Sequence, residues 1–159
     1  MSVLTETEKA WLACAIDSEG SIVIGKGRVK KKHVIFVPMV NLSNTHQGYI
    51  DHARELINRV AGNSYTSRAH KSSVHKVVHR IGVMSFPRVT AILKEILPYL
   101  IIKKDRADNI LAWAIYRDER RRNGRPFYDE GDFKFITMGR EIATSKWTKK
   151  DVITTSLCS

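Results

Sequence analysis

Two acidic residues follow the first helix that the sequence predicts, within the stretch LACAIDSEG (12–20). The run from Thr5 to Ile16 has the marks of a helix, and Asp17 and Glu19 come directly after it. A helix C-terminus carries partial negative charge, so each acid placed there costs roughly 0.3–1 kcal/mol. Because two carboxylates are unfavourable at this place without a partner, we expect a positively charged group or ion to bind beside them.

The same helix carries a stripe of small residues that leads to one of these acids. Ala10, Ala13, Cys14 and Asp17 recur at helical spacing, whereas the opposite side is apolar and predicts a core face with Leu12, Ala15 and Ile16. A stripe of small side chains lets two helix backbones approach closely. The partner is either another element of this chain or a second copy of the same helix.

The charge distribution predicts a polyanionic partner. The chain of 159 residues has 27 Lys and Arg against 16 Asp and Glu, a net charge of +11. Two stretches without any acid, 21–48 and 62–94, hold five and six of these cations. Nucleic acid is the first candidate. A membrane surface is disfavoured, because these stretches look like strands rather than an amphipathic helix.

Composition predicts an intracellular globular chain, cytoplasmic or organellar, with no membrane partner and no small-molecule cofactor. Its apolar runs are too short to span a bilayer, and the opening MSVLTETEKAW lacks the blocks of a signal peptide. Two cysteines, Cys14 and Cys158, provide neither a disulfide framework nor paired metal ligands. The histidines also lack zinc-site spacing.

Hydrophobic periodicity predicts an α+β fold with one antiparallel sheet, helices on one face and a basic opposite face. The strand candidates, in two hairpins around the turns KKK and KSS, are 21–29 with 33–43 and 65–70 with 74–83. The helices expected besides the first are 48–62, 87–100, 103–124 and a short one near 131–143. Pro38 favours an edge position or a bulge within its strand. The expected division is a core domain, 1–125, with a C-terminal extension, 126–159.

LACAIDSEG resembles the signature of the LAGLIDADG homing endonucleases. The identical positions are Leu12, Ala13, Ile16, Asp17 and Gly20, with Glu19 in place of the second Asp. The departures from the signature are Cys14, Ala15 and Ser18. The α-β-β-α-β-β-α fold of the family matches the element order from about Lys9 to Arg122. LSNT (42–45) and LPYLIIKKDRA (97–107) are also similar to stretches that supply active-site residues in the family.

The resemblance implies an intron-encoded, site-specific endonuclease that hydrolyses double-stranded DNA across the minor groove. Glu19 matches the metal-binding acid, with the Ser18 backbone carbonyl as a second ligand. Asp17 matches an acid that is more structural than metal-binding. Carboxylate and carbonyl oxygens suit Mg²⁺, which activates water and neutralises phosphate charge. A solvated surface acid is the alternative interpretation of Glu19.

The resemblance also implies two further catalytic positions. Asn44 falls where a polar side chain orients the attacking water, with Gln47 close enough to compete. Alternatively, Asn44 is a turn residue or the cap of the next helix. Lys103 matches the active-site lysine that stabilises developing charge, and Lys104 is its rival by one register step.

A single copy of the motif implies a homodimer and a pseudo-palindromic target. In the family the signature helices pack against each other along their small residues. The expected interface residues are Ala10, Trp11, Ala13, Cys14 and Asp17.

The two hairpins are expected to bind DNA, since a two-stranded β-ribbon fits the major groove. The candidate contacts with bases or backbone are Lys26, Arg28, Lys30, Lys32, Asn41, Arg68, His70, His75, Lys76 and Arg80. Strand alternation turns about half of such a set away from the DNA, and the sequence leaves open which half. A non-cleaving DNA-binding regulator and an RNA maturase with the same fold remain alternatives. A basic ribosome-associated protein would leave the two acids after the first helix without a reason.

Overall fold

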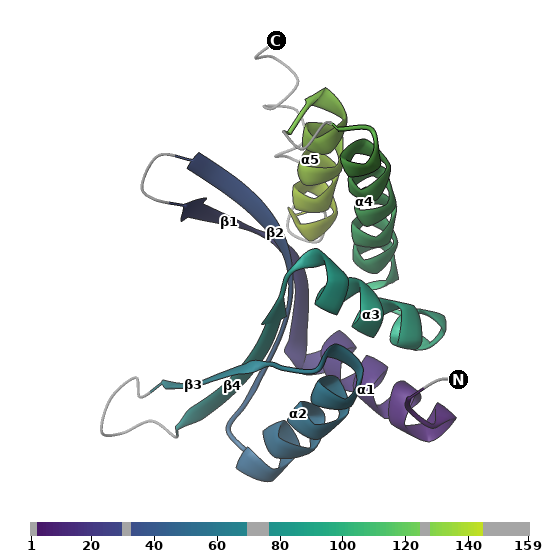
Figure 1. Cartoon of the computed structure of the whole chain (residues 1–159). Coiled ribbons are helices and arrows are strands. Elements are labelled where there is room, and N and C mark those ends of the chain that lie inside the picture. Colours follow the sequence, from purple (N-terminus) through teal and green to yellow (C-terminus); the bar gives the residue numbers. More distant parts are fainter. Residues whose placement is uncertain (1–2, 30–32, 70–76, 125–127, 145–159) are drawn as a thin grey trace.

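The computed structural model describes residues 3–29, 33–69, 77–124 and 128–144, and in these the helices cover one face of a four-stranded sheet (Figure 1). The elements in chain order are α1 Glu6–Glu19, β1 Gly20–Val29, β2 His33–Asn44, α2 Gln47–Ala61, β3 Tyr65–Ala69, β4 Val78–Met84, α3 Phe86–Ile96, the 3₁₀ helix η1 Leu97–Tyr99, α4 Lys104–Arg122 and α5 Glu130–Thr144. The predicted α+β order is confirmed. None of the described helices is long and apolar enough to cross a membrane.

The sheet has the order β1-β2-β4-β3, and all its neighbouring strands are antiparallel. Both predicted hairpins are therefore confirmed, and each lies at one side of the sheet. The β1–β2 register runs without a bulge from Gly20↔Leu42 to Val29↔His33. Because β1 and β2 are longer than β4, their hairpin extends beyond the end of β4, as Figure 1 shows.

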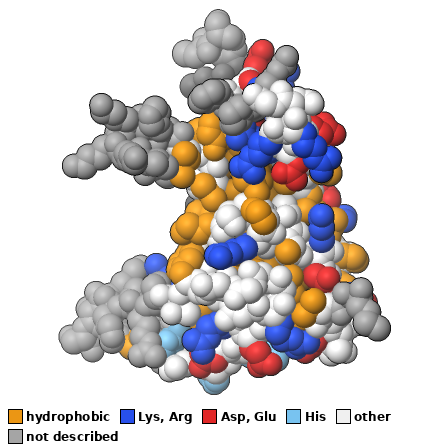
Figure 2. All heavy atoms as spheres, in the orientation of Figure 1, with side chains coloured by type: hydrophobic (Ala, Val, Ile, Leu, Met, Phe, Trp, Pro, Cys, Tyr) orange, Lys and Arg blue, Asp and Glu red, His pale blue; other side chains and the backbone are white. Residues whose placement is uncertain are grey.

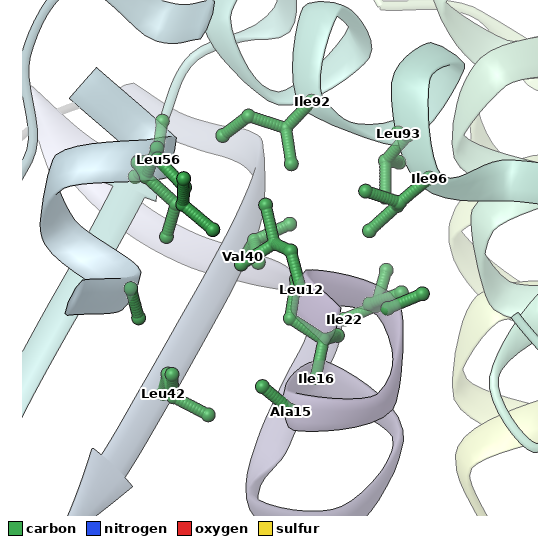
Figure 3. Close-up of a cluster of buried hydrophobic side chains, with 14 of the residues drawn as sticks. Leu12, Ala15, Ile16, Ile22, Val40, Leu42, Leu56, Ile92, Leu93 and Ile96 are labelled. Carbon is green, nitrogen blue, oxygen red and sulfur yellow. The ribbon is translucent and has the colours of Figure 1, made fainter. Parts of the chain in front are cut away.

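Strand alternation divides the sheet into a helix-covered face and an open face. Ile22, Val40, Leu42, Ile81 and Val83 point to the helices and are almost fully buried. They meet apolar side chains of α1, α2 and α3, shown with part of the cluster in Figure 3: Leu12, Ala15, Ile16, Leu56, Ile92, Leu93 and Ile96. Burial of each large side chain contributes about 1.5–3 kcal/mol, so this core holds α1 firmly against the sheet.

Local chemistry sets the start of α1 as predicted. Thr5 Oγ1 accepts a hydrogen bond from the Glu8 backbone N–H at 3.3 Å, and Glu8 Oε2 accepts one from the Thr5 N–H at 2.7 Å. This reciprocal capping box satisfies donors that the first turn would otherwise leave unpaired. Arg59 of α2 binds the same carboxylate at 2.6 Å and joins the two helices.

Pro38 lies where β2 has a strand neighbour on one side only. It pairs with Ile24 of β1, whereas the ladder with β4 begins one residue later, at Met39↔Met84. The predicted edge position is therefore correct locally, although β2 is an inner strand of the sheet. Further along, the Tyr128 hydroxyl accepts from the Phe36 N–H and donates to the Phe36 carbonyl, both at 3.0 Å. A side chain thus takes the hydrogen bonds that β4 would have supplied.

Tyr128 belongs to a second core formed where α4 and α5 pack beside the far part of the β1–β2 hairpin. Its buried members are Phe36, Trp113 and Ile136. Asp132 is fully buried and accepts hydrogen bonds from the Trp113 Nε1–H at 2.8 Å and from Arg117 Nη1 at 3.3 Å. A buried carboxylate is tolerated only with such partners. The Asp132 carboxylate therefore fixes α5 against α4.

We predict that Asp132→Ala lowers the free energy of unfolding by about 3–5 kcal/mol, because it leaves the buried Arg117 charge without this carboxylate. Urea denaturation followed by circular dichroism measures the change. Asp118→Ala, at an exposed position of α4, is the matched control and should change stability by less than about 0.5 kcal/mol. An equally small effect of Asp132→Ala would show that this carboxylate does not hold α5.

Candidate active site and nucleic-acid interface

The C-terminal end of α1 is tied to the segment that precedes α4 through Asp17. Its buried carboxylate accepts backbone hydrogen bonds from Ile101 at 2.7 Å, Ile102 at 3.1 Å and Lys103 at 2.9 Å. Burial alone would raise the pKa of Asp17, but these three N–H donors and the Lys103 charge outweigh it and lower the pKa. Asp17 thus has a structural role in this chain.

Lys103 supplies a positive charge at the end of α1, next to Asp17. Its ammonium donates to the backbone carbonyl of Ile16 at 2.9 Å and to that of Asp17 at shorter range. A cation is favourable on the last carbonyls of a helix, where the dipole is negative. The rival Lys104 lies on the exposed surface of α4, 4.0 Å from Asp108. The structure therefore brings Lys103, and not Lys104, to the end of α1.

Glu19 lines an open hollow of about 390 Å³ at the end of α1. The other lining residues come from β1, β2, β3 and β4 and are Gly20, Ser21, Asn41, Leu42, Ser43, Tyr65, Arg80 and Ile81. Arg80 is exposed and pairs across the sheet with Ser43. An exposed carboxylate and a guanidinium thus share one hollow that opens beside the sheet.

The donors at this end of α1 fit a hard cation. In the described part of the chain, no three His, Cys, Asp or Glu side chains gather as a metal site. Mg²⁺, however, needs only one or two carboxylates, because waters and substrate phosphates complete its shell. The exposed Glu19 carboxylate, with the backbone carbonyl of Ser18 next to it, is an oxygen set of this kind.

The two candidates for orienting water lie outside the Glu19 hollow. The Asn44 side-chain oxygen accepts a hydrogen bond from the His46 N–H at 2.8 Å. Asn44 is therefore a turn residue, which was the alternative to its role in orienting water. Gln47 begins α2 and lines a separate hollow of about 540 Å³. Arg80 lines both hollows and is the residue common to them.

The exposed side of α1 differs in part from the predicted interface stripe. Ala10 and Cys14 are exposed, and Trp11 is half-buried against Tyr49, with ring centroids 5.2 Å apart. Ala13, however, is completely buried in this chain's own core, as is most of Asp17. A partner helix would therefore contact Ala10, Cys14 and the edge of Trp11, while Ala13 packs within the chain.

The predicted DNA contacts fall into four groups. Asn41 and Arg80 lie on the open face, since their neighbours Val40 and Ile81 are buried. Lys26 alternates with Ile24 and pairs with the buried Phe36, so it lies on the helix-bearing side instead. Arg28 and Arg68 are in β1 and β3, but their side chains lie outside the description. The candidates wholly outside the described residues are Lys30, Lys32, His70, His75 and Lys76.

The open face is not uniformly basic over the described residues, in contrast to the expectation. Val23, Met39 and Met84 form one apolar row across β1, β2 and β4, and Met84 is 45% exposed. Figure 2 shows hydrophobic side chains in the recess between the two hairpins. In this part of the sheet both faces carry apolar side chains. A count of charges along the sequence could not reveal apolar residues on the open face.

Comparison with solved structures identifies the fold. The homing endonuclease I-CvuI in complex with DNA superposes with a TM-score of 0.67 and 14% identity, over 91% of this chain and 85% of that one. The archaeal intron-encoded endonuclease I-Vdi141I, also bound to DNA, gives 0.62 and 12%, over 91% and 86%. The endonuclease I-TnaI gives 0.59 and 14%, over 93% of both chains. No family model and no curated protein matches the sequence.

The chain has the homing-endonuclease fold. The similarity extends over most of each compared chain. The predicted resemblance to LAGLIDADG homing endonucleases is confirmed at the level of structure. At these identities the similarity shows the fold alone.

Within this homing-endonuclease fold, sequence reasoning missed Tyr49 and Tyr65. Tyr49 lies near Glu19: burial raises its pKa, a hydrogen bond with Ser18 opposes this, and the Glu19 charge adds to it. Tyr65 lines the Glu19 hollow and bonds Asn41. The place of Tyr49 depends on the packing of α2 against Trp11 of α1, and that of Tyr65 depends on strand register.

We predict that Asp17→Ala lowers the free energy of unfolding by about 3 kcal/mol at neutral pH, because three backbone donors lose a charged acceptor. Since folding lowers the pKa of Asp17, its stabilisation is complete above the ordinary value of 3.8 and disappears as pH falls through the lower folded value. The difference between the two proteins should therefore shrink in acid. Urea denaturation at neutral and acidic pH measures it, with the exposed Asp118→Ala as control. A difference independent of pH would contradict the carboxylate as its cause.

Proposed function

We propose that the protein is a Mg²⁺-dependent, site-specific DNA endonuclease of the intron-homing type, acting as a homodimer on a pseudo-palindromic duplex. The observation that carries this proposal is the end of α1. There Glu19 is exposed, and Asp17 holds Lys103 on the last carbonyls of the same helix. The arrangement combines an exposed carboxylate with a fixed cation at one helix end, and hydrolysis of a phosphodiester in a metal-dependent site would use both.

The residues divide the work of phosphodiester hydrolysis among them. Glu19 and the Ser18 carbonyl would hold Mg²⁺, which supplies Lewis-acid activation of water and phosphate when bound. The Lys103 ammonium lies on the last carbonyls of α1. Its charge stabilises the negative charge that develops as water attacks phosphorus and the bond to the leaving oxygen breaks. Arg80, in the same hollow as Glu19, binds the phosphate.

Asn44 and Gln47 receive weaker support as the residues that orient water. The Asn44 oxygen is engaged in a turn, whereas Gln47 is exposed at the start of α2 and lines a hollow next to Arg80. Between these two, Gln47 is therefore the better candidate for a polar contact near the bound phosphate.

A second copy would complete the surface around α1. Ala10 and Cys14 present small exposed side chains that permit close helix packing. At the Asp17 end, Ile101 is 86% exposed and Ile102 is 53% exposed, although both backbones are held by the Asp17 carboxylate. Large apolar side chains fixed in water are unusual and mark interaction surfaces. Symmetric packing of two copies would cover them and bring two Glu19 carboxylates together.

Recognition of DNA would use both sides of the open face. Asn41 and Arg80 offer donors to bases and phosphates, while the apolar row of Val23, Met39 and Met84 suits thymine methyl groups. The cations that the sequence places in and near the hairpin turns would bind phosphate and set the register on the duplex.

We predict that Glu19→Gln abolishes cleavage and preserves DNA binding, because the amide keeps the size of the side chain but loses the charge that holds the metal. Purified protein would be incubated in Mg²⁺ with a library of partly palindromic duplexes, and the cut sequences recovered. Glu55→Gln, the same change on the exposed surface of α2, is the control and should cleave normally. Selective binding by the native protein without cutting in any divalent metal would instead support a non-cleaving regulator.

We also predict that Ala10→Glu converts the protein to a monomer, because two symmetry-related carboxylates would meet at the α1 contact. Sedimentation equilibrium of the native protein should give a dimer, and that of the variant a single chain with unchanged circular dichroism. Arg54→Glu reverses a charge on the exposed side of α2 and should leave the dimer intact. A dimeric Ala10→Glu variant would place the interface elsewhere.

A further inference from the structure

One row of residues crosses all four strands on the open face. Ser21 of β1 pairs with Asn41 of β2, Asn41 with Gly82 of β4, and Gly82 with Tyr65 of β3. Asn41 and Tyr65 therefore stand two strands apart. An ordinary side chain at the position between them would keep them from touching.

Gly82 removes that obstacle. The Tyr65 side chain lies over the Gly82 backbone, and a Cβ built at Gly82 would overlap both the tyrosine ring and the Asn41 amide oxygen. The Tyr65 hydroxyl reaches Asn41 and donates to its Oδ1 at 2.6 Å. The glycine thus allows a bridge from the edge strand β3 to the inner strand β2.

The bridge contributes little to the stability of the fold. Tyr65 is 40% exposed, and a hydrogen bond open to water competes with solvation at both of its ends. Tyr65, Gly82 and Asn41 nevertheless occupy the wall of hollows on the open face, where DNA would bind. Their arrangement is better explained by what Asn41 offers to a ligand.

The bridge determines the hydrogen-bonding character of Asn41. A free asparagine pairs with adenine through both its oxygen and its nitrogen, as acceptor and donor. Here the Asn41 oxygen accepts the Tyr65 proton and is turned toward the tyrosine, so the two amide N–H groups are the side of the amide presented to a base. In the major groove, guanine is the base that presents two acceptors and no donor, N7 and O6.

We propose that Asn41, oriented by Tyr65 across Gly82, recognises guanine at one position of each half-site, and that Tyr65 is the positioning residue that sets this specificity. The inference rests on the proposed DNA-binding function. It adds the identity of the base that Asn41 recognises. It assigns Tyr65 a role in selectivity rather than in catalysis.

The test is a selection of bound duplexes from a randomised library in Ca²⁺, comparing native protein with Tyr65→Phe. The native protein should enrich guanine at one position per half-site. Tyr65→Phe frees the Asn41 oxygen, so the guanine-to-adenine ratio at that position should fall about tenfold or more. Tyr99→Phe, the same change in η1 on the helix-bearing side, should select the same sequences as native. Thermal unfolding checks that each variant is folded.

Asn41→Asp gives a second, opposite readout. The carboxylate still accepts the Tyr65 proton but has no donor, so the preference should move from guanine to cytosine, whose N4 donates. If both Tyr65→Phe and Asn41→Asp retain the native base preferences and affinity, the inference is wrong while the DNA-binding function stands. If the folded native protein selects no duplex, the inference and the proposed function both fail.

Discussion

The Asp17 carboxylate is the contact on which the arrangement of the whole site depends. It accepts three consecutive backbone N–H groups just before α4, and this brings Lys103 onto the last carbonyls of α1. Asp17 would be unfavourable at the end of an isolated helix. Here three backbone N–H donors and the Lys103 cation, all from the segment before α4, compensate for its charge. Glu19, two residues later, is left exposed, so one helix end combines a fixed cation with an available carboxylate.

The C-terminal helices give the β1–β2 hairpin a support that the sheet itself lacks. Before Met39, β2 has no β4 partner, and the Tyr128 hydroxyl replaces one pair of ladder hydrogen bonds at Phe36. The buried Asp132 in turn fixes α5 through Trp113. Without this support the hairpin would extend from the sheet with one side of β2 unpaired.

Local signals in the sequence predicted much of this structure. The capping box at Thr5, the strand alternation and the stop at Gly62 depend on neighbouring residues, so the element order could be derived. The orientation of Lys26 and the burial of Ala13 depend on register and on packing between distant segments, which a single sequence does not contain. The Tyr65–Asn41 bond is harder still, since it joins residues 24 positions apart through a glycine on a third strand.

In the proposed function each chain supplies half of an active site, and a symmetric copy completes it over one minor groove. The most direct measurement is to map the cut positions on both strands of a duplex selected by the native protein in Mg²⁺. We predict one cut per strand, at positions related by the dyad of a pseudo-palindromic site and facing the same minor groove. Cuts confined to one strand, or placed without regard to any dyad, would contradict the symmetric arrangement of two Glu19 sites.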